Sequence, residues 1–244
     1  AEAGHRTQHQ LSRADRTAIQ RVVCIGEPIA STFGKPNLLA QRIADQCGFS
    51  LHGTYAGTEM ATACTEREPF EGHVVPTELL HVEVVDEQGA PVPEGGIGEV
   101  VATPFGVEAM PLLRFRTGDI CAWRMGTNEA GTPAMLLGPV LGRKEQRLKL
   151  KGTTLFPAQV TDAMNALPEP PEFVMVCVKD EYGGDELEIL VDAEGAALGR
   201  LREHLRAALR VSPRLTTLPR QAIATMKWPP GARKPHFFID RRDI

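Results

Sequence analysis

The succession of short apolar runs and turns in the first quarter of the chain constrains the fold more than any other feature. Residues 21–26 form an apolar run that ends at a glycine, which is typical of a buried strand. Pro36 can open a helix with one apolar face, and Gly48 can end it. Residues 50–55 indicate a second strand, and the polar segment 55–59 (Tyr-Ala-Gly-Thr-Glu) leads into the turn beyond it. Because ligands of open α/β sheets bind where loops leave the carboxyl ends of strands, this pattern predicts an α/β fold with a ligand-binding turn.

A β-rich stretch follows. Four runs separated by turn-forming residues are strand candidates: 79–86, 97–103, 112–116 and 120–124. The segment 117–119 (Thr-Gly-Asp) is expected at a bend between the last two runs, because glycine and aspartate favour turns.

The pattern changes after Gly142. A helix candidate, two strands, an amphipathic helix and a last strand follow one another at 157–167, 173–179, 186–192, 198–210 and 215–218. This order is typical of a small α+β domain, so we expect a domain boundary near residues 143–145.

Charge and hydropathy argue against several kinds of partner. The 244-residue chain has a formal net charge of -4 and a pI near 6.0, which gives no electrostatic case for nucleic acid or an anionic membrane. No apolar run approaches the ~20 residues that span a bilayer, and the polar N-terminus has no signal-peptide core. We therefore expect a cytoplasmic protein, and a processed, trimmed or partial one because it lacks an initiator Met.

Cysteine and histidine usage indicates neither a disulfide framework nor a metal centre. The five cysteines are odd in number and widely spaced, with no Cys-x-x-Cys pair, so we expect mostly buried thiols in a reducing compartment. The seven histidines are scattered, so their spacing does not predict a histidine-based metal site.

Four short segments carry the chemistry, and their order matters more than any one of them. They are the segments 55–59, 114–119 (Arg-Phe-Arg-Thr-Gly-Asp) and 142–145 (Gly-Arg-Lys-Glu), followed by the isolated Lys234. Together they supply a hydroxyl, carboxylates, an arginine and a lysine, which suit a triphosphate, a metal ion and a ribose. The set therefore predicts a nucleotide-handling enzyme.

The ordered set resembles the C-terminal half of the phenylacetate-CoA ligase family. This family belongs to the adenylate-forming superfamily of acyl-CoA synthetases, adenylation domains and luciferases. Residues 26–28 (Gly-Glu-Pro) resemble the family's adenine-side segment, and 55–59 resemble Tyr-Gly-x-Thr-Glu. Residues 111–119, 142–146 and 151–157 resemble Pro-Leu-Ile-Arg-Tyr-Arg-Thr-Gly/Arg-Asp, Gly-Arg-x-Asp-Asp and Arg-Gly-Val-Asn-Val-Phe-Pro. The resemblance extends over about residues 20–244.

The resemblance implies a fold class and a division into domains. The fold is α/β: the C-terminal part of the large adenylate-forming domain, with a mixed sheet and a β-rich subdomain, followed by a small α+β C-terminal domain. On this basis residues 1–143 belong to the AMP-binding large domain, 144–145 form a hinge and 146–244 form a lid domain.

The resemblance also implies site residues. The implied nucleotide-binding residues are Gly26, Glu27, Pro28, Tyr55, Ala56, Gly57, Thr58, Asp119 and Arg143; the implied catalytic residues are Lys234, Thr58 and Glu59; the implied hinge residues are Lys144 and Glu145. Thr58 would donate to a phosphate oxygen and Glu59 would hold Mg²⁺. Asp119 would accept the ribose hydroxyls, and Lys234 would bridge the substrate carboxylate and the α-phosphate. Each residue also has a plainer interpretation as part of a polar turn, a surface arginine or a basic tail.

Several positions depart from the family pattern. Ala56 replaces a glycine, Glu145-Gln146 replaces Asp-Asp, and Arg233 replaces the glycine before the family lysine. The Ser/Thr/Gly-rich phosphate loop of the superfamily is absent from this sequence, as is most of the acyl pocket.

The implied activity is that of an acid-thiol ligase. It would adenylate a carboxylic acid, expected to be aromatic and phenylacetate-like, with ATP and Mg²⁺, and transfer the acyl group to CoA; no zinc is expected. A non-catalytic nucleotide-binding or interaction module, an enzyme that loads a carrier protein, pairing with a separate N-terminal half, and a homodimer all stay open.

Overall fold

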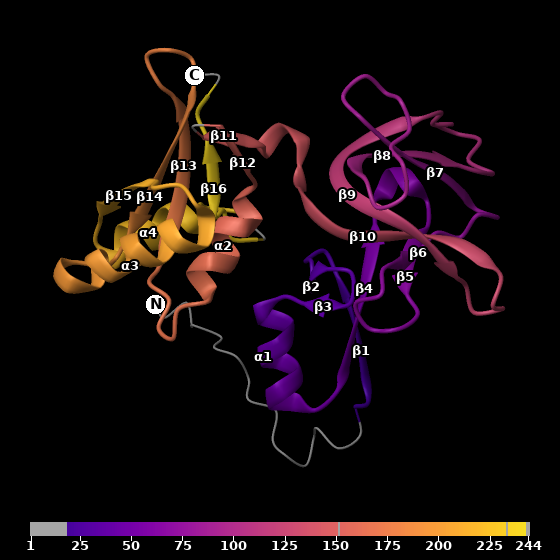
Figure 1. Cartoon of the computed structure of the whole chain (residues 1–244), viewed down its shortest axis with the longest axis horizontal. Coiled ribbons are helices and arrows are strands. Elements are labelled where there is room, and N and C mark those ends of the chain that lie inside the picture. Colours follow the sequence, from indigo (N-terminus) through magenta and orange to yellow (C-terminus); the bar gives the residue numbers. More distant parts are fainter. Residues whose placement is uncertain (1–18, 151, 233, 243–244) are drawn as a thin grey trace. The chain divides into compact units, whose positions relative to one another are not determined.

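A computed structural model describes residues 19–150, 152–232 and 234–242 (Figure 1). Contacts between Cα atoms divide the chain into two compact units. Of the described residues, the first unit contains those up to Val82 with 102–115 and 123–139, and the second contains 83–101, 116–122 and those from Val140 onward.

The first unit begins with a strand–helix–strand element. Strand β1 (Arg21–Ile25) pairs in parallel with β4 (Ser50–Ala56), and helix α1 (Leu38–Cys47) connects them. Asn37 caps the helix by accepting a hydrogen bond from the Ala40 amide at 2.9 Å. Gly48 ends it in the left-handed conformation with φ of 75°, as the sequence predicts. Pro36 does not open the helix; it lies in the short strand β3 (Lys35–Pro36), which pairs with β2 (Ala30–Thr32).

The large sheet is mixed, as predicted. Its hydrogen-bonded order is β1-β4-β5-β6-β10-β9-β8-β7. The strands that follow β4 along the chain are β5 (Ala63–Glu66), β6 (His73–Val74), β7 (Leu80–Val85), β8 (Ile97–Pro104), β9 (Phe115–Thr127) and β10 (Pro133–Arg143). The pairs β4–β5, β5–β6 and β6–β10 are antiparallel.

One strand prediction was wrong in a way that concerns the site. Residues 117–119 lie inside the continuous strand β9, rather than at a bend between two strands. Gly118 has φ of 77°, a conformation that glycine adopts without steric cost. It therefore supplies a local irregularity within the strand where the sequence suggested a turn.

The C-terminal part of the second unit has the predicted α+β fold. Its four-stranded sheet has the order β15-β14-β13-β16, from β13 (Phe173–Lys179), β14 (Asp185–Val191), β15 (Arg214–Thr217) and β16 (Phe238–Asp240). Helices α2 (Pro157–Asn165), α3 (Gly195–Leu209) and α4 (Arg220–Lys227) accompany it, with the hairpin β11 (Leu148–Leu150) and β12 (Thr153–Leu155) (Figure 1). Met164, Met175, Ile189 and Leu205 are fully buried in the core that α2 and α3 form with this sheet.

Within the described residues, no helix is both long enough and apolar enough to cross a membrane.

Candidate functional site

The segment 55–59 lies at the tip of the β4–β5 hairpin. Tyr55 and Ala56 pair with Cys64 and Ala63, and a short 3-10 helix, η1 (Thr58–Met60), connects the two strands. Met60 is buried beneath this tip, whereas Thr58 and Glu59 are exposed. The hairpin therefore presents a hydroxyl and a carboxylate side by side to solvent.

The Glu59 side chain lies close to Gly57 at this tip. A Cβ atom on Gly57 would lie 3.4 Å from Glu59 Oε2, so the carboxylate folds back over the glycine. This position places a carboxylate oxygen next to the backbone of the turn.

Residues 26–28 lie at the same edge of the sheet as this hairpin tip. Because β1 and β4 are parallel, with Ile25 opposite Thr54, the segments that follow them leave the sheet at the same end. Gly26 has φ of 84°, and Pro28 is anchored through its carbonyl, which accepts a hydrogen bond from Asn37 Nδ2 at 2.7 Å. The structure thus brings together two segments that the sequence proposed separately, at the edge where α/β sheets bind ligands.

Asp119 and Arg143 form the second group that the structure brings together. They lie on the neighbouring strands β9 and β10, with Arg143 Nε 3.5 Å from Asp119 Oδ1. The Asp119 amide donates to Thr117 Oγ1 at 3.1 Å, and that hydroxyl donates to the Val100 carbonyl at 2.9 Å. The Asp119 backbone is thereby held in place within the strand.

The predicted hinge residues are in the 3-10 helix η2 (Lys144–Gln146), directly after β10. Lys144 Nζ lies 3.0 Å from Glu99 Oε2, and Arg116 Nη1 lies 2.9 Å from the same oxygen. The Glu145 carbonyl accepts a hydrogen bond from the Arg242 guanidinium. The sequence analysis missed Glu99. The only feature of the sequence that could have indicated it is a carboxylate within an otherwise apolar strand, β8.

Lys234 is exposed and forms no hydrogen bond or ion pair with another residue of the described ranges. The structure therefore does not join it to any other predicted site residue.

No disulfide joins any two of the five cysteines, all of which lie in the described ranges, and Cys64, Cys121 and Cys177 are buried. Burial raises the pKa of Cys64 to about 12, which makes its thiolate scarce at neutral pH. This agrees with a packing role for that thiol.

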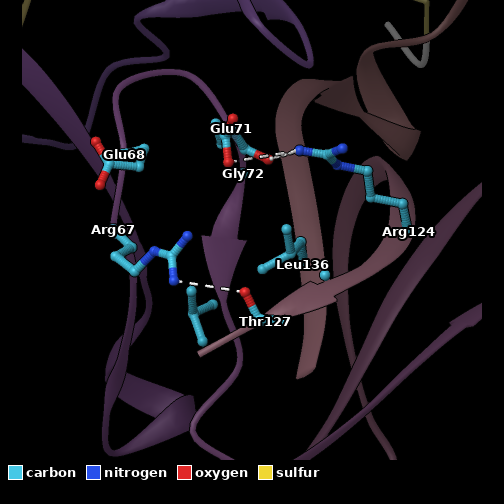
Figure 2. Close-up of a pocket in the computed structure, with 9 residues that line it drawn as sticks. Arg67, Glu68, Glu71, Gly72, Arg124, Thr127 and Leu136 are labelled. Carbon is cyan, nitrogen blue, oxygen red and sulfur yellow. Dashed lines mark hydrogen bonds and ion pairs between the residues drawn. The ribbon is translucent and has the colours of Figure 1, made fainter. Parts of the chain in front are cut away.

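A pocket of about 170 Å³ lies elsewhere in the first unit. Figure 2 shows Arg67 and Arg124 on opposite sides of it. Arg67 donates to Thr127 Oγ1 at 3.4 Å, and Arg124 donates to the Glu71 carbonyl at 2.9 Å while lying over the Phe33 ring. None of the predicted site residues lines this pocket.

Two of three comparisons with known proteins found matches. No family model matches the chain. The phenylacetate-coenzyme A ligase of Thermus thermophilus is 30% identical over 178 residues, which cover 72% of this chain and 36% of that protein. The Pseudomonas putida enzyme of the same name is 24% identical over 183 residues, covering 70% of this chain and 40% of the relative.

Solved structures support the fold. A 2-hydroxyisobutyryl-CoA ligase in its postadenylation state matches with a TM-score of 0.68 at 22% identity, covering 91% of this chain and 48% of that one. A benzoate CoA ligase from Burkholderia xenovorans matches with a TM-score of 0.59 at 20% identity, covering 86% and 44% respectively.

These matches define the class: the chain has the fold of the C-terminal part of adenylate-forming CoA ligases. Within that class, the predicted resemblance to phenylacetate-CoA ligases is confirmed by the homologues of that name. The chain spans about two fifths or less of the length of these two curated relatives.

Proposed function

We propose that this chain forms the nucleotide-binding wall of an ATP-dependent, AMP-forming acid-CoA ligase. The observation that carries the proposal is the meeting of residues 26–28 and 55–59 at the carboxyl ends of the parallel strands β1 and β4. In the proposed reaction, a carboxylate oxygen of the acid attacks the α-phosphorus of ATP and pyrophosphate leaves. The CoA thiol then attacks the acyl-adenylate carbonyl, and AMP leaves.

The hairpin tip would bind the adenine and the phosphates. Tyr55 would stack near the adenine. Gly26, Glu27 and Pro28 would lie on the other side of the adenine. Ala56 and Gly57 would allow close approach of the backbone, and the exposed Thr58 hydroxyl would donate to a phosphate oxygen. Such donors stabilise the negative charge that develops during attack.

Glu59 is suited to hold Mg²⁺. The described residues contain no group of three or more His, Cys, Asp or Glu that could form a protein-only metal site. Mg²⁺ typically binds one or two carboxylates together with substrate phosphates and waters, so a single exposed carboxylate beside a phosphate site fits the ion. When bound, the ion would offset phosphate charge in the adenylation step.

Asp119 and Arg143 would bind the ribose. A carboxylate can accept both ribose hydroxyls, and Arg143 can donate to the ribose or a phosphate because its side chain is 68% exposed. Lys234 would bridge the acid and the α-phosphate. Lys144 and Glu145 would be the hinge between a large domain ending at residue 143 and a lid beginning at residue 146.

An aromatic, phenylacetate-like acid is the proposed substrate, since four curated relatives are named phenylacetate-coenzyme A ligase. Transfer to a carrier protein is a second candidate. A probable non-canonical nonribosomal peptide synthetase of Salinispora arenicola is 28% identical over 188 residues, and this similarity supports the second candidate. A non-catalytic module has less support, because the curated relatives carry enzyme names. ATP and CoA supply would place the enzyme in the cytoplasm.

Acid-dependent exchange between pyrophosphate and ATP tests the adenylation step. A full-length enzyme that contains this chain should be assayed with phenylacetate, benzoate and an aliphatic acid, with and without Mg²⁺. Exchange that depends on an aromatic acid and on Mg²⁺ is the expected result. Calorimetric titration of the chain with ATP tests the nucleotide-binding wall by itself, and the absence of binding would contradict it.

A further inference from the structure

A buried polar row crosses the sheet just below the proposed nucleotide-binding hairpin. Glu66 on β5 lies opposite His73 on β6, and His73 lies opposite Leu137 on β10. Gly53 on β4 lies one residue before Thr54, whose partner on β5 is Thr65. Both Glu66 and His73 are buried, at 5% and 8% exposure.

Glu66 joins β4 to this row through its side chain. The β4–β5 register runs from Ala56 opposite Ala63 to Thr54 opposite Thr65. One step further, the Gly53 amide donates to Glu66 Oε2 at 2.7 Å. Hydrogen bonds from a buried amide to a carboxylate are stronger than bonds between neutral groups. The Glu66 side chain therefore fixes the base of the hairpin whose tip carries Thr58 and Glu59.

The same carboxylate oxygen also holds the turn after β5. It accepts a hydrogen bond from the Phe70 amide at 3.1 Å. Phe70 has φ of 64°, a strained conformation for a residue with a side chain, so this turn depends on its partners. In addition, His52 Nδ1 lies 3.4 Å from the Glu66 carbonyl. One buried residue thus ties together β4, β5 and the turn that leads to β6.

Gly53 is required by this arrangement. A Cβ atom there would lie 2.9 Å from His73 Nε2 and 3.3 Å from Glu66 Cδ. A glycine inside a strand commonly marks such a close approach. The absent side chain gives the carboxylate and the imidazole room against the β4 backbone.

His73 connects the row to the aromatic residue of the site. Its Nδ1 donates to the Leu137 carbonyl at 3.1 Å, and its ring centroid lies 6.3 Å from that of Tyr55. Burial lowers the pKa of His73, partly offset by the nearby Glu66 carboxylate. The His73 ring packs beside the Tyr55 ring, below the hairpin tip.

We propose that Glu66, supported by His73, is the positioning residue of the nucleotide-binding hairpin. It sets the register of β4 and thereby the locations of Tyr55, Thr58 and Glu59. Its effect on nucleotide affinity rests on the proposed function, whereas its effect on the hairpin does not.

The test compares Glu66→Ala with Glu66→Gln, which keeps an acceptor oxygen, and with Glu68→Ala, an exposed carboxylate in the same turn. Hydrogen exchange of residues 54–62 and calorimetric ATP titration are the two readouts. Loss of the acceptor leaves the Gly53 and Phe70 amides without their partner and so loosens the base of the hairpin. We therefore expect hydrogen exchange of residues 54–62 in E66A to be about tenfold faster or more. The ATP dissociation constant should rise about tenfold at unchanged stoichiometry. E66Q should recover part of both effects, and E68A should match the wild type.

The proposal would be overturned if folded E66A showed the hydrogen exchange and the ATP affinity of the wild type. A lower ATP stoichiometry at unchanged ATP affinity would also overturn it, because that result indicates general destabilisation. If E66A does not fold, E66Q and Gly53→Ala test the same prediction, because Gly53→Ala displaces the carboxylate without removing it. If the wild type does not bind ATP, the proposed function fails for this chain, while hydrogen exchange still decides the role of Glu66.

Discussion

Arg143 Nε lies 3.5 Å from Asp119 Oδ1, across two neighbouring strands of the large sheet. Because the Arg143 side chain is 68% exposed, this ion pair contributes at most about 1 kcal/mol to stability. Its contribution to the fold is therefore small. Under the proposed function, a ribose would offer hydroxyls that both side chains can bind.

Asp119→Asn tests this interpretation. The substitution replaces one acceptor oxygen by a donor, so we expect AMP affinity to fall about 10- to 100-fold, which corresponds to hydrogen bonds to a charged group. Calorimetric titration with AMP measures the change. Asp45→Asn, which alters an exposed carboxylate on α1, is the matched control. Equal AMP affinity in the two variants would remove Asp119 from the proposed site.

Glu99 should matter more for stability than its partner Lys144. The Glu99 side chain is 6% exposed and contacts two cations, whereas the Lys144 side chain is 38% exposed. Lys144→Met leaves Glu99 paired with Arg116, so its cost should stay below about 1 kcal/mol. Glu99→Ala removes the acceptor of both cations and should cost about 1–3 kcal/mol. Urea unfolding of the two variants gives the comparison, and the reverse order would contradict it.

Thiol alkylation should follow burial. Burial raises the pKa of Cys64 to about 12, so at pH 8 its thiolate is about one part in 10⁴. Cys47 is only partly buried and should react with iodoacetamide first. Peptide mapping after timed alkylation identifies the order. If Cys64 were modified as quickly in the native protein as in urea, its thiol would not be buried, and the prediction would be wrong.

Asp185 gives stability a defined pH dependence. Burial acts to raise its pKa, but the Lys149 amide, Lys179 and Arg242 outweigh burial, so the pKa lies below the ordinary value of 3.8. The unfolded chain then binds the proton more readily, and the stabilisation is present above about pH 4. It is lost as the pH falls through the native pKa.

Asp185→Asn should therefore lower the free energy of unfolding at pH 7 by about 1–3 kcal/mol. The difference from the wild type should shrink as the pH is lowered below 4. Urea unfolding at pH 7, 5 and 3.5 measures the trend. A difference that grows on acidification would have the wrong sign.

The sequence predicts strands and helices well where a local pattern determines them. The apolar runs in β13 and β14 and the leucine spacing in α3 each locate an element to within a few residues. Gly48 ends α1 as expected because the left-handed cap is a local preference of glycine. The polar turn after β4 was also recognised, because small and polar residues favour turns locally.

Other features depend on contacts that local patterns do not contain. Gly118 lies inside β9 because neighbouring strands continue the sheet on both sides, and Pro36 lies in β3 because that segment pairs with β2. The link from Glu66 to Gly53 joins residues on different strands through a side chain. The sequence analysis did not single out Glu66, because no local pattern shows that its side chain is buried or that it reaches the Gly53 amide.

Photoaffinity labelling with 8-azido-ATP, followed by peptide mapping, tests the central claim most directly. A nucleotide-binding wall at this position predicts label that AMP displaces, in the peptides that contain residues 26–28 and Tyr55. Label confined to the pocket of Arg67 and Arg124, or label that AMP does not displace, would contradict a nucleotide-binding wall at the carboxyl ends of β1 and β4.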